Sequence, residues 1–449
     1  MDLPPELYGE YSQPSPKYYW NPSEYDSPEN FLCCPHARSR EGWLDVETLR
    51  SLRLTSKAFN QAATSILFRS VRILCRPGLE NEVTGFDSMV ESLLVPRATF
   101  EPSVKSLRIF LRNHHVQRGF LHDTSWNFVD DKNAMIAFID KMPRVTKNLS
   151  QLESLQIFFP TWSSKYSDMD DGTVQLDLDL LSHFRATIST ALSATPLSNL
   201  TELRLSLPCT HDFVEVSTTV PDSLLARLKA LFLSVTDATG PGGRKEYLYW
   251  ADETTDGDDG FPHSNLQQQY PNTGHMQGIF AIVSRCHNLE TLGLQGTQLL
   301  DGDLLEWSPA SSGLQSLFLE RVKFSSSNLI KLFSPNKSLE ISKSRLMRIW
   351  LEVVDLTADF WEEVFSHLLL CPKLEFVHLD EVSYARGSEN FDLKLWFGRP
   401  WEDSTELMST REEDEEAMLA VRDYLVGKAG GSEAYSEKFG ERYGLQPDQ

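Results

Sequence analysis

Cysteine is scarce in this chain, long apolar runs are missing, and basic residues are outnumbered. The six cysteines among 449 residues are scattered, at Cys33, Cys34, Cys75, Cys209, Cys286 and Cys371. This distribution favours reduced thiols over a disulfide framework. No apolar run reaches the roughly 18 residues that span a bilayer, and MDLPPELYGEYSQP has neither a basic start nor an apolar core. We therefore expect a cytoplasmic or nuclear protein with no membrane partner.

The charge balance bears on the kind of partner. Lys and Arg number 42 against 64 Asp and Glu, a formal net charge of −22. Binding to phosphate backbones requires a basic footprint, so we expect no nucleic-acid partner. A hydrophobic content of 41% with 24% charged residues is typical of globular chains.

Motifs for catalysis and cofactors are also missing. The chain has no G-x-S-x-G, no H-E-x-x-H and no G-x-x-x-x-G-K-[ST]. CCPH at Cys33 lacks a second Cys/His pair at finger spacing, and DETTDGDDGFPH from Asp252 has His263 where a calcium loop needs Glu. Cys209, His211 and His183 could form a thiol site, but structural roles are favoured. We expect a non-catalytic protein without cofactor or metal.

What the chain does contain is a recurring six-residue phrase with apolar residues at positions one, four and six. It occurs as VKSLRI at 104, LESLQI at 152, LTELRL at 200, LKALFL at 228, LETLGL at 289, LQSLFL at 314, LMRIWL at 346 and LEFVHL at 374. This spacing is the core of the leucine-rich-repeat pattern L-x-x-L-x-L.

The segments between the phrases have helical patterns, as in LLSHFRATISTALSA from Leu180 and DFWEEVFSHLLL from Asp359. Repeated strand–helix units predict an α/β leucine-rich-repeat solenoid with parallel strands and convex helices. An ordinary α/β domain is the alternative. The first two intervals, of 48 residues each, predict either a degenerate extra repeat or a long insertion.

Alternate strand residues face away from the core, so the aligned phrases predict two rows on the concave face. The inner row is Arg108, Gln156, Arg204, Phe232, Gly293, Phe318, Trp350 and His378; the next is Phe110, Phe158, Ser206, Ser234, Gln295, Glu320, Glu352 and Asp380. The last three repeats place Phe318, Trp350 and His378 beside Glu320, Glu352 and Asp380. An exposed aromatic row flanked by carboxylates predicts a site for a basic protein segment, although a merely solvated face is the alternative.

A compact helical unit precedes the repeats at residues 44–75. Leu44, Leu49 and Leu52 recur at helical spacing, Ser56 is placed to cap a second helix, and SILFRSVRI leads into a β-prone run.

The pieces LRSLRLTSKAF, NQAATSI and LFRSVRI resemble the second half of an F-box of the kind common in fungal proteins, and LPPEL at Leu3 resembles its opening. The resemblance, which covers residues 3 to about 73, implies an F-box protein with leucine-rich repeats. It implies that the chain binds a Skp-type adaptor and tethers a captured substrate protein to a cullin-RING ubiquitin ligase of the SCF type. The adaptor-facing residues that it implies are Leu3, Pro4, Pro5, Leu44, Leu49 and Leu52.

The chain departs from the F-box pattern in one respect. Some forty residues separate LPPEL from the leucine run, so either an insertion loops out or the first helix is lost. A scaffold of leucine-rich repeats with a degenerate F-box as its N-terminal cap is therefore the alternative function. We expect Phe59, Ile66, Leu67 and Phe68 to form the core of the unit or its junction with the repeats.

The remaining boundaries follow composition. Residues 1–43 are expected to be irregular, and the repeats occupy residues 76–400 with a long loop at about 237–275, rich in Gly, Pro, Asp and Asn. Residues 401–449 are expected to form an acidic helix, ended by Gly430 and Gly431, and a tail.

Overall fold

The structure is a computed structural model that describes most of the chain. The described residues are 50–51, 53–75, 101–111, 129–159, 176–194, 197–239, 264–307, 313–333, 344–391 and 406–439. Within these ranges no helix is long and apolar enough to cross a membrane.

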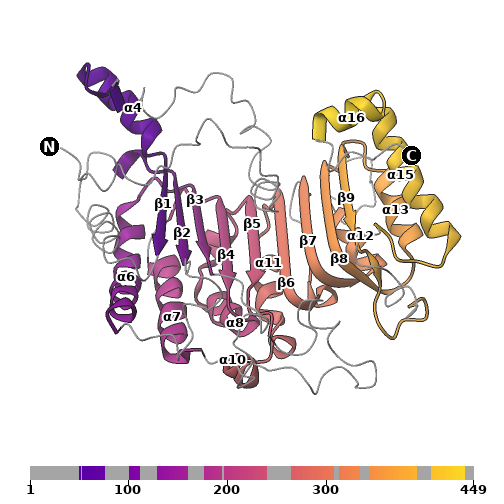
Figure 1. Cartoon of the computed structure of the whole chain (residues 1–449), viewed down its shortest axis with the longest axis horizontal. Helices are drawn as coiled ribbons and strands as arrows, with labels where there is room; N and C mark the ends of the chain where they lie inside the picture. The colour runs from indigo at the N-terminus through magenta and orange to yellow at the C-terminus, as the bar shows by residue number, and fades with distance from the viewer. Residues whose placement is uncertain are drawn as a thin grey trace.

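In the described part of the chain, ten strands form one parallel sheet in which β1 to β8 each pair with the next strand along the chain. Figure 1 shows them side by side from the N-terminal edge to the C-terminal edge. The strands are β1 (Ser70–Cys75), β2 (Ser106–Leu111), β3 (Ser154–Phe158), β4 (Glu202–Leu207), β5 (Ala230–Val235), β6 (Thr291–Asp301), β7 (Ser316–Ser325), β8 (Arg348–Ala358), β9 (Phe376–Asp380) and β10 (Ser383–Tyr384). Both β9 and β10 pair with β8.

All eight phrases predicted as strands are strands, β2 to β9. Neither long interval adds a strand to the sheet between its flanking phrases, because β2 pairs directly with β3 and β3 directly with β4. The described part of each interval contains one helix, α6 (Val129–Asn148) or α7 (Leu178–Ala194), and residues 112–128 and 160–175, where an insertion would fall, lie outside the described residues. The run SVRI is also a strand, since β1 pairs with β2.

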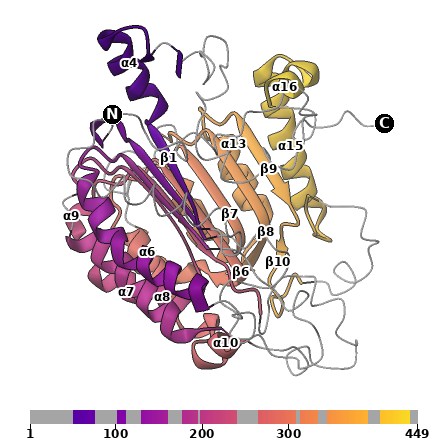
Figure 2. The same cartoon turned by 60° about the vertical axis from the view of Figure 1, so that its left-hand side comes forward.

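The connecting helices lie on one side of the curved sheet (Figure 2). We call the opposite face of the sheet the concave face. Neighbouring helices contact each other in chain order, from α6 through α7 and α8 to α11, and from α12 through α13 to α15. These and the shorter elements are α8 (Thr210–Thr219), α9 (Asp222–Leu225), α11 (Gln277–Ser284), α12 (Ser326–Phe333), α13 (Trp361–Leu369), η2 (Glu101–Ser103) and η7 (Gly302–Leu304). The arrangement is an α/β fold compatible with a solenoid.

The N-terminal unit contains the helix α4 (Lys57–Leu67), which extends beyond the β1 edge of the sheet (Figures 1 and 2). Ser56 caps it as predicted, because its hydroxyl accepts a hydrogen bond from the Phe59 amide at 3.2 Å. Phe68 joins the main core, and Leu67 packs against it.

Part of the segment expected to be a loop at 237–275 is regular. Residues 264–275 include α10 (Asn265–Gln269) and η6 (Asn272–Gly274), and residues 240–263 lie outside the described part of the chain. Ser264 begins α10 as its N-cap and also donates a hydrogen bond to Asp237 across the base of this segment.

The C-terminal region forms two helices where one helix and a tail were expected. The acidic helix α15 (Glu412–Ala429) ends at Gly430, whose φ of 95° is the left-handed conformation that glycine adopts readily. A second helix, α16 (Ser432–Phe439), follows at once. Helix α15 packs on α13 and so covers the last repeat.

Two apolar clusters lie on the two faces of the sheet. The main core includes the phrase residues that point toward the helices, such as Leu107, Leu205 and Leu317. The second cluster consists of Phe232, Phe318, Trp350 and Phe376, with Phe439 packed against it. Since these four residues alternate with the core leucines along their strands, the second cluster belongs to the concave face.

Candidate functional site

The pairing of the strands brings the predicted concave rows together as the sequence indicated. Phe318 on β7 pairs with Trp350 on β8, which pairs with His378 on β9. Two residues further along the same strands, Glu320 pairs with Glu352, which pairs with Asp380. The predicted register is also confirmed for the five earlier repeats, from Arg108 through Gln156, Arg204 and Phe232 to Gly293.

The expectation that this aromatic row is exposed is wrong for its inner part. Phe318 has no exposed side-chain surface, Trp350 is 6% exposed and Glu320 is 7% exposed. His378, Glu352 and Asp380, nearer the C-terminal edge, are each partly exposed. The reason is that this face carries its own packed apolar cluster, which a sequence pattern of alternating residues does not reveal.

The aromatic side chains form a continuous band across β5 to β9. The ring centroids of Phe232 and Phe318 are 5.7 Å apart although β6 lies between their strands. Gly293 is the β6 residue between them, and because it has no side chain the two rings can meet above it. The band continues from Phe318 to Trp350 at 6.0 Å and from Trp350 to His378 at 3.9 Å.

Hydrogen bonds organise the neighbouring polar row. The Ser234 hydroxyl donates to Gln295 at 2.7 Å, and the Gln295 amide donates to Glu320 at 2.5 Å. The Trp350 indole nitrogen donates to Glu352 at 3.2 Å. Glu320 and Glu352 therefore each accept a hydrogen bond from a polar donor of this face, which reduces the repulsion between them.

A buried guanidinium group continues the concave face toward the N-terminus. The Arg204 Nε donates to Glu202 at 2.9 Å, and Gln156 donates to the same carboxylate oxygen at 2.9 Å. The Arg204 guanidinium also lies 5.7 Å from the centre of the Phe232 ring, at cation–π distance. The guanidinium charge on this part of the face is therefore paired with a carboxylate.

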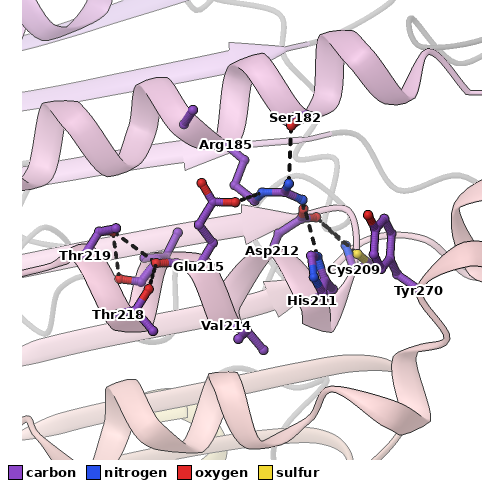
Figure 3. Close-up of polar contacts among 12 residues, drawn as sticks. Ser182, Arg185, Cys209, His211, Asp212, Val214, Glu215, Thr218, Thr219 and Tyr270 are labelled. Atoms are coloured by element: carbon purple, nitrogen blue, oxygen red, sulfur yellow. Dashed lines mark hydrogen bonds and ion pairs between the residues drawn. The ribbon is translucent and has the colours of Figure 1, made fainter.

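The possible thiol site on the helical side is a structural cluster (Figure 3). Arg185 on α7 forms ion pairs with Asp212, at 2.8 Å, and with Glu215 on α8, which joins the two helices. Cys209 is fully buried, and its thiol donates to Asp212 at 3.3 Å. Burial and the nearby Asp212 carboxylate raise the pKa of Cys209 well above its usual value, so its thiol is a poor nucleophile.

The side chains of the two histidines in that candidate have other partners than the thiol. His211 stacks on Tyr270 with ring centroids 4.0 Å apart, and burial lowers its pKa. His183 pairs instead with Asp140 at 2.8 Å. No group of three or more His, Cys, Asp or Glu side chains that could hold a metal ion occurs among the described residues. CCPH and the Asp252 segment lie outside them.

The six adaptor-facing residues implied by the F-box resemblance, Leu3, Pro4, Pro5, Leu44, Leu49 and Leu52, all lie outside the described residues. The structure instead exposes three other apolar side chains of this unit, Leu54 at 88%, Phe59 at 52% and Ile66 at 44%.

Phe59 and Ile66 were expected in the core of the unit. Their seven-residue spacing places them on one side of α4, where the small side chain of Ala63 lies between them and is buried, and Phe68 is buried at the end of the helix. Spacing alone identifies such a side but does not tell whether it faces the protein or the solvent.

Comparison with known proteins finds no protein-family model that matches this chain and no curated protein with a significant sequence match.

Proposed function

We propose that this chain is a substrate-recognition subunit of a cullin-RING ubiquitin ligase of the SCF type. In this proposal the F-box-like unit docks a Skp-type adaptor, the adaptor binds the cullin, and the concave face of the leucine-rich-repeat solenoid captures a substrate protein. The chain itself supplies no catalytic group.

The observation that carries the proposal is the apolar surface of α4. Large apolar side chains that lie in water cost free energy, and contiguous exposed ones mark sites of protein association. Among the described residues of the N-terminal unit, Phe59 and Ile66 are exposed large apolar side chains on α4, a helix that extends away from the sheet, and Leu54 is exposed in the turn before it. A partner that covers this side of α4 would bury Phe59 and Ile66.

The charge of the N-terminal unit indicates what kind of partner it would bind. Residues 50–75 carry Arg50, Arg53, Lys57, Arg69 and Arg72 and no acidic residue, within a chain of net charge −22. An excess of basic residues in the same stretch as exposed apolar ones favours association with an acidic protein.

The sheet supports the capture role. Neighbouring parallel strands lie about 4.8 Å apart and together present one continuous face. On this face, polar and aromatic rows from different repeats lie side by side. His378, Glu352 and Asp380 are its partly exposed members near the C-terminal edge. This is the part of the face that we propose as the site for a basic segment of the substrate.

One observation favours the alternative, a scaffold in which the N-terminal unit is only a cap. Phe68 belongs to the main core and α4 contacts η2, so the unit also shields the first repeat. A cap needs no partner, whereas an adaptor-docking unit does.

Binding to a Skp-type adaptor distinguishes the two functions. We expect the full chain to co-purify with the adaptor, and Phe59→Asp with Ile66→Asp to reduce binding by about tenfold or more because a charge enters the apolar contact. Leu370→Asp is the matched control, since Leu370 is a similarly exposed apolar residue, at 55%, on the far repeat. A wild-type chain that does not bind would support the scaffold.

A further inference from the structure

The last turn of α16 covers the C-terminal end of the aromatic band. Phe439 packs on Phe376 with ring centroids 5.1 Å apart, and Lys438 forms an ion pair with Glu375 at 3.0 Å. In both views α16 lies over the end of the sheet at which β9 begins (Figures 1 and 2). Phe376 is 3% exposed beneath it.

We infer that this end of the concave face is a docking site for a helical segment that carries an aromatic residue next to a basic one, and that α16 occupies the site as an internal competitor. The inference rests on the proposed capture role of the concave face. The chemistry of the partner follows from the helix that is seated there now, namely Tyr435 and Phe439 four residues apart on one side, with Lys438 beside Phe439.

The connection between α15 and α16 would allow α16 to detach from the sheet. Gly430 and Gly431 join it to α15 with φ angles of 95° and 123°, and glycine tolerates a wider range of backbone angles than any other residue. Helix α15 itself is firmly held, because the buried carboxylate of Asp414 accepts hydrogen bonds from the Glu362 amide and the Ser409 hydroxyl at 2.9 and 2.7 Å. Movement at the two glycines would therefore displace α16 alone.

The contacts of α16 combine two aromatic side chains, Tyr435 in the main core and Phe439 against Phe376, with an ion pair. Its ion pair is exposed, with Lys438 at 53% and Glu375 at 37%, and such pairs contribute little in water. Tyr435 is buried, and among the described residues its hydroxyl faces the backbone of Val377 without a well-aligned hydrogen bond. A buried hydroxyl without a partner opposes burial, so part of the apolar contribution of Tyr435 is offset.

A competitor of this kind restricts access to the site. A tethered helix acts at a high effective concentration, of the order of millimolar for a short flexible connection. A partner segment in solution binds only if its contacts exceed those of α16 or if α16 is first displaced. The site would thus select partners that place more apolar surface, or a better-placed cation, on Phe376 and Glu375.

The test measures binding of a fluorescent peptide with the sequence GSEAYSEKFG, residues 431–440, to the full-length chain. We expect weak binding to the wild type and binding about tenfold stronger to Phe439→Glu, which places a carboxylate beside Glu375 and releases α16. Leu419→Glu is the matched control, since Leu419 is an exposed apolar residue of α15, and it should bind as the wild type does. A peptide with Phe replaced by Ala should bind neither.

A second variant moves the equilibrium in the opposite direction. Tyr435→Phe removes the unpaired hydroxyl while keeping the ring, so α16 should be held more tightly. Hydrogen exchange of the α16 amides should then be slower than in the wild type, and in Phe439→Glu it should be faster, with the Val421 and Leu425 amides of α15 unchanged in both.

Two results would overturn the inference. One is equal binding of the peptide by the wild type and Phe439→Glu, and the other is α16 exchange as slow as that of α15 in all three proteins. Neither measurement involves the adaptor, so adaptor binding remains an independent test of the proposed function.

Discussion

The hydroxyl of Tyr384 on β10 donates a hydrogen bond to the buried carboxylate of Asp414 on α15. This contact joins the last strand of the sheet to the helix that covers it. The Glu362 amide of α13 and the Ser409 hydroxyl donate to the same carboxylate. Asp414 therefore attaches α15 to β10 and to α13, and Ser409, just before α15, is its third donor.

Asp414→Ala should destabilise this cap. The change leaves three donors without their acceptor in a buried place, and we expect the free energy of unfolding to fall by about 2–4 kcal/mol. Chemical denaturation monitored by circular dichroism measures it. Glu416→Ala, at an exposed position two residues along the same helix, should change stability by no more than about 0.5 kcal/mol. Equal effects of the two substitutions would contradict the role given to Asp414.

Gly293→Leu should disrupt the aromatic band. A side chain at this position would occupy the place where the Phe232 and Phe318 rings meet, so the rings must separate. We expect a loss of about 1–3 kcal/mol in the free energy of unfolding, as for other overpacked cores.

Gly427→Leu provides the control for that substitution. Nothing lies within 4 Å of a Cβ at Gly427, and a helix favours leucine over glycine, so this variant should be as stable as the wild type or slightly more stable. If Gly293→Leu were equally well tolerated, the two rings could not be in contact as described.

Much of the fold follows from the spacing of the leucines. The phrases around Leu317 and Ile349 predicted both the strands and their pairing, because apolar positions one, four and six fix which residues face the helices. Burial of Phe318 and Trp350 could not be predicted in this way. It depends on an aromatic cluster assembled from several repeats, to which Phe439 is added from a helix more than sixty residues beyond Phe376.

In the N-terminal unit, too, burial could not be predicted from the sequence, but here side chains expected to be buried are exposed. Ser56 was predicted as a helix cap from local chemistry alone, and this is confirmed. Whether Phe59 faces a core or the solvent depends on the neighbours of α4 in space, which helical spacing does not specify. The local pattern therefore identified the helix but not the direction of its apolar side.

Asp237 should make stability depend on pH. Its carboxylate is buried and accepts hydrogen bonds from Thr239 and Ser264, and burial raises its pKa to about 6. Because the folded state holds the proton more tightly than the unfolded state, the protonated group adds stability at low pH, and this contribution is lost as pH rises from about 4 through about 6. The pKa is raised because burial destabilises the ionised carboxylate relative to the protonated one.

The variant Asp237→Asn isolates that contribution. Between pH 5 and pH 7.5 the wild type should lose about 1 kcal/mol of unfolding free energy more than the variant, measured by urea denaturation at both pH values. Asp222→Asn, at a surface position with an 83% exposed side chain, should follow the wild type. A parallel pH dependence of the wild type and Asp237→Asn would contradict the assignment.

Cys209 should be inert in the folded protein. Its raised pKa and complete burial keep the thiol protonated and inaccessible at pH 8. We expect mass spectrometry to find no alkylation of Cys209 by iodoacetamide in the native chain and complete alkylation after denaturation. Rapid modification of the native thiol would instead indicate a reactive site between α7 and α8.

We propose that the N-terminal unit docks a Skp-type adaptor and links the chain to a cullin, and reconstitution tests this proposal most directly. The purified full chain, the adaptor and the cullin are mixed and separated by size-exclusion chromatography with light scattering. We expect one complex that contains all three in equal amounts and that the Phe59→Asp and Ile66→Asp double variant fails to form. Elution of the wild-type chain apart from an intact adaptor–cullin complex would contradict it.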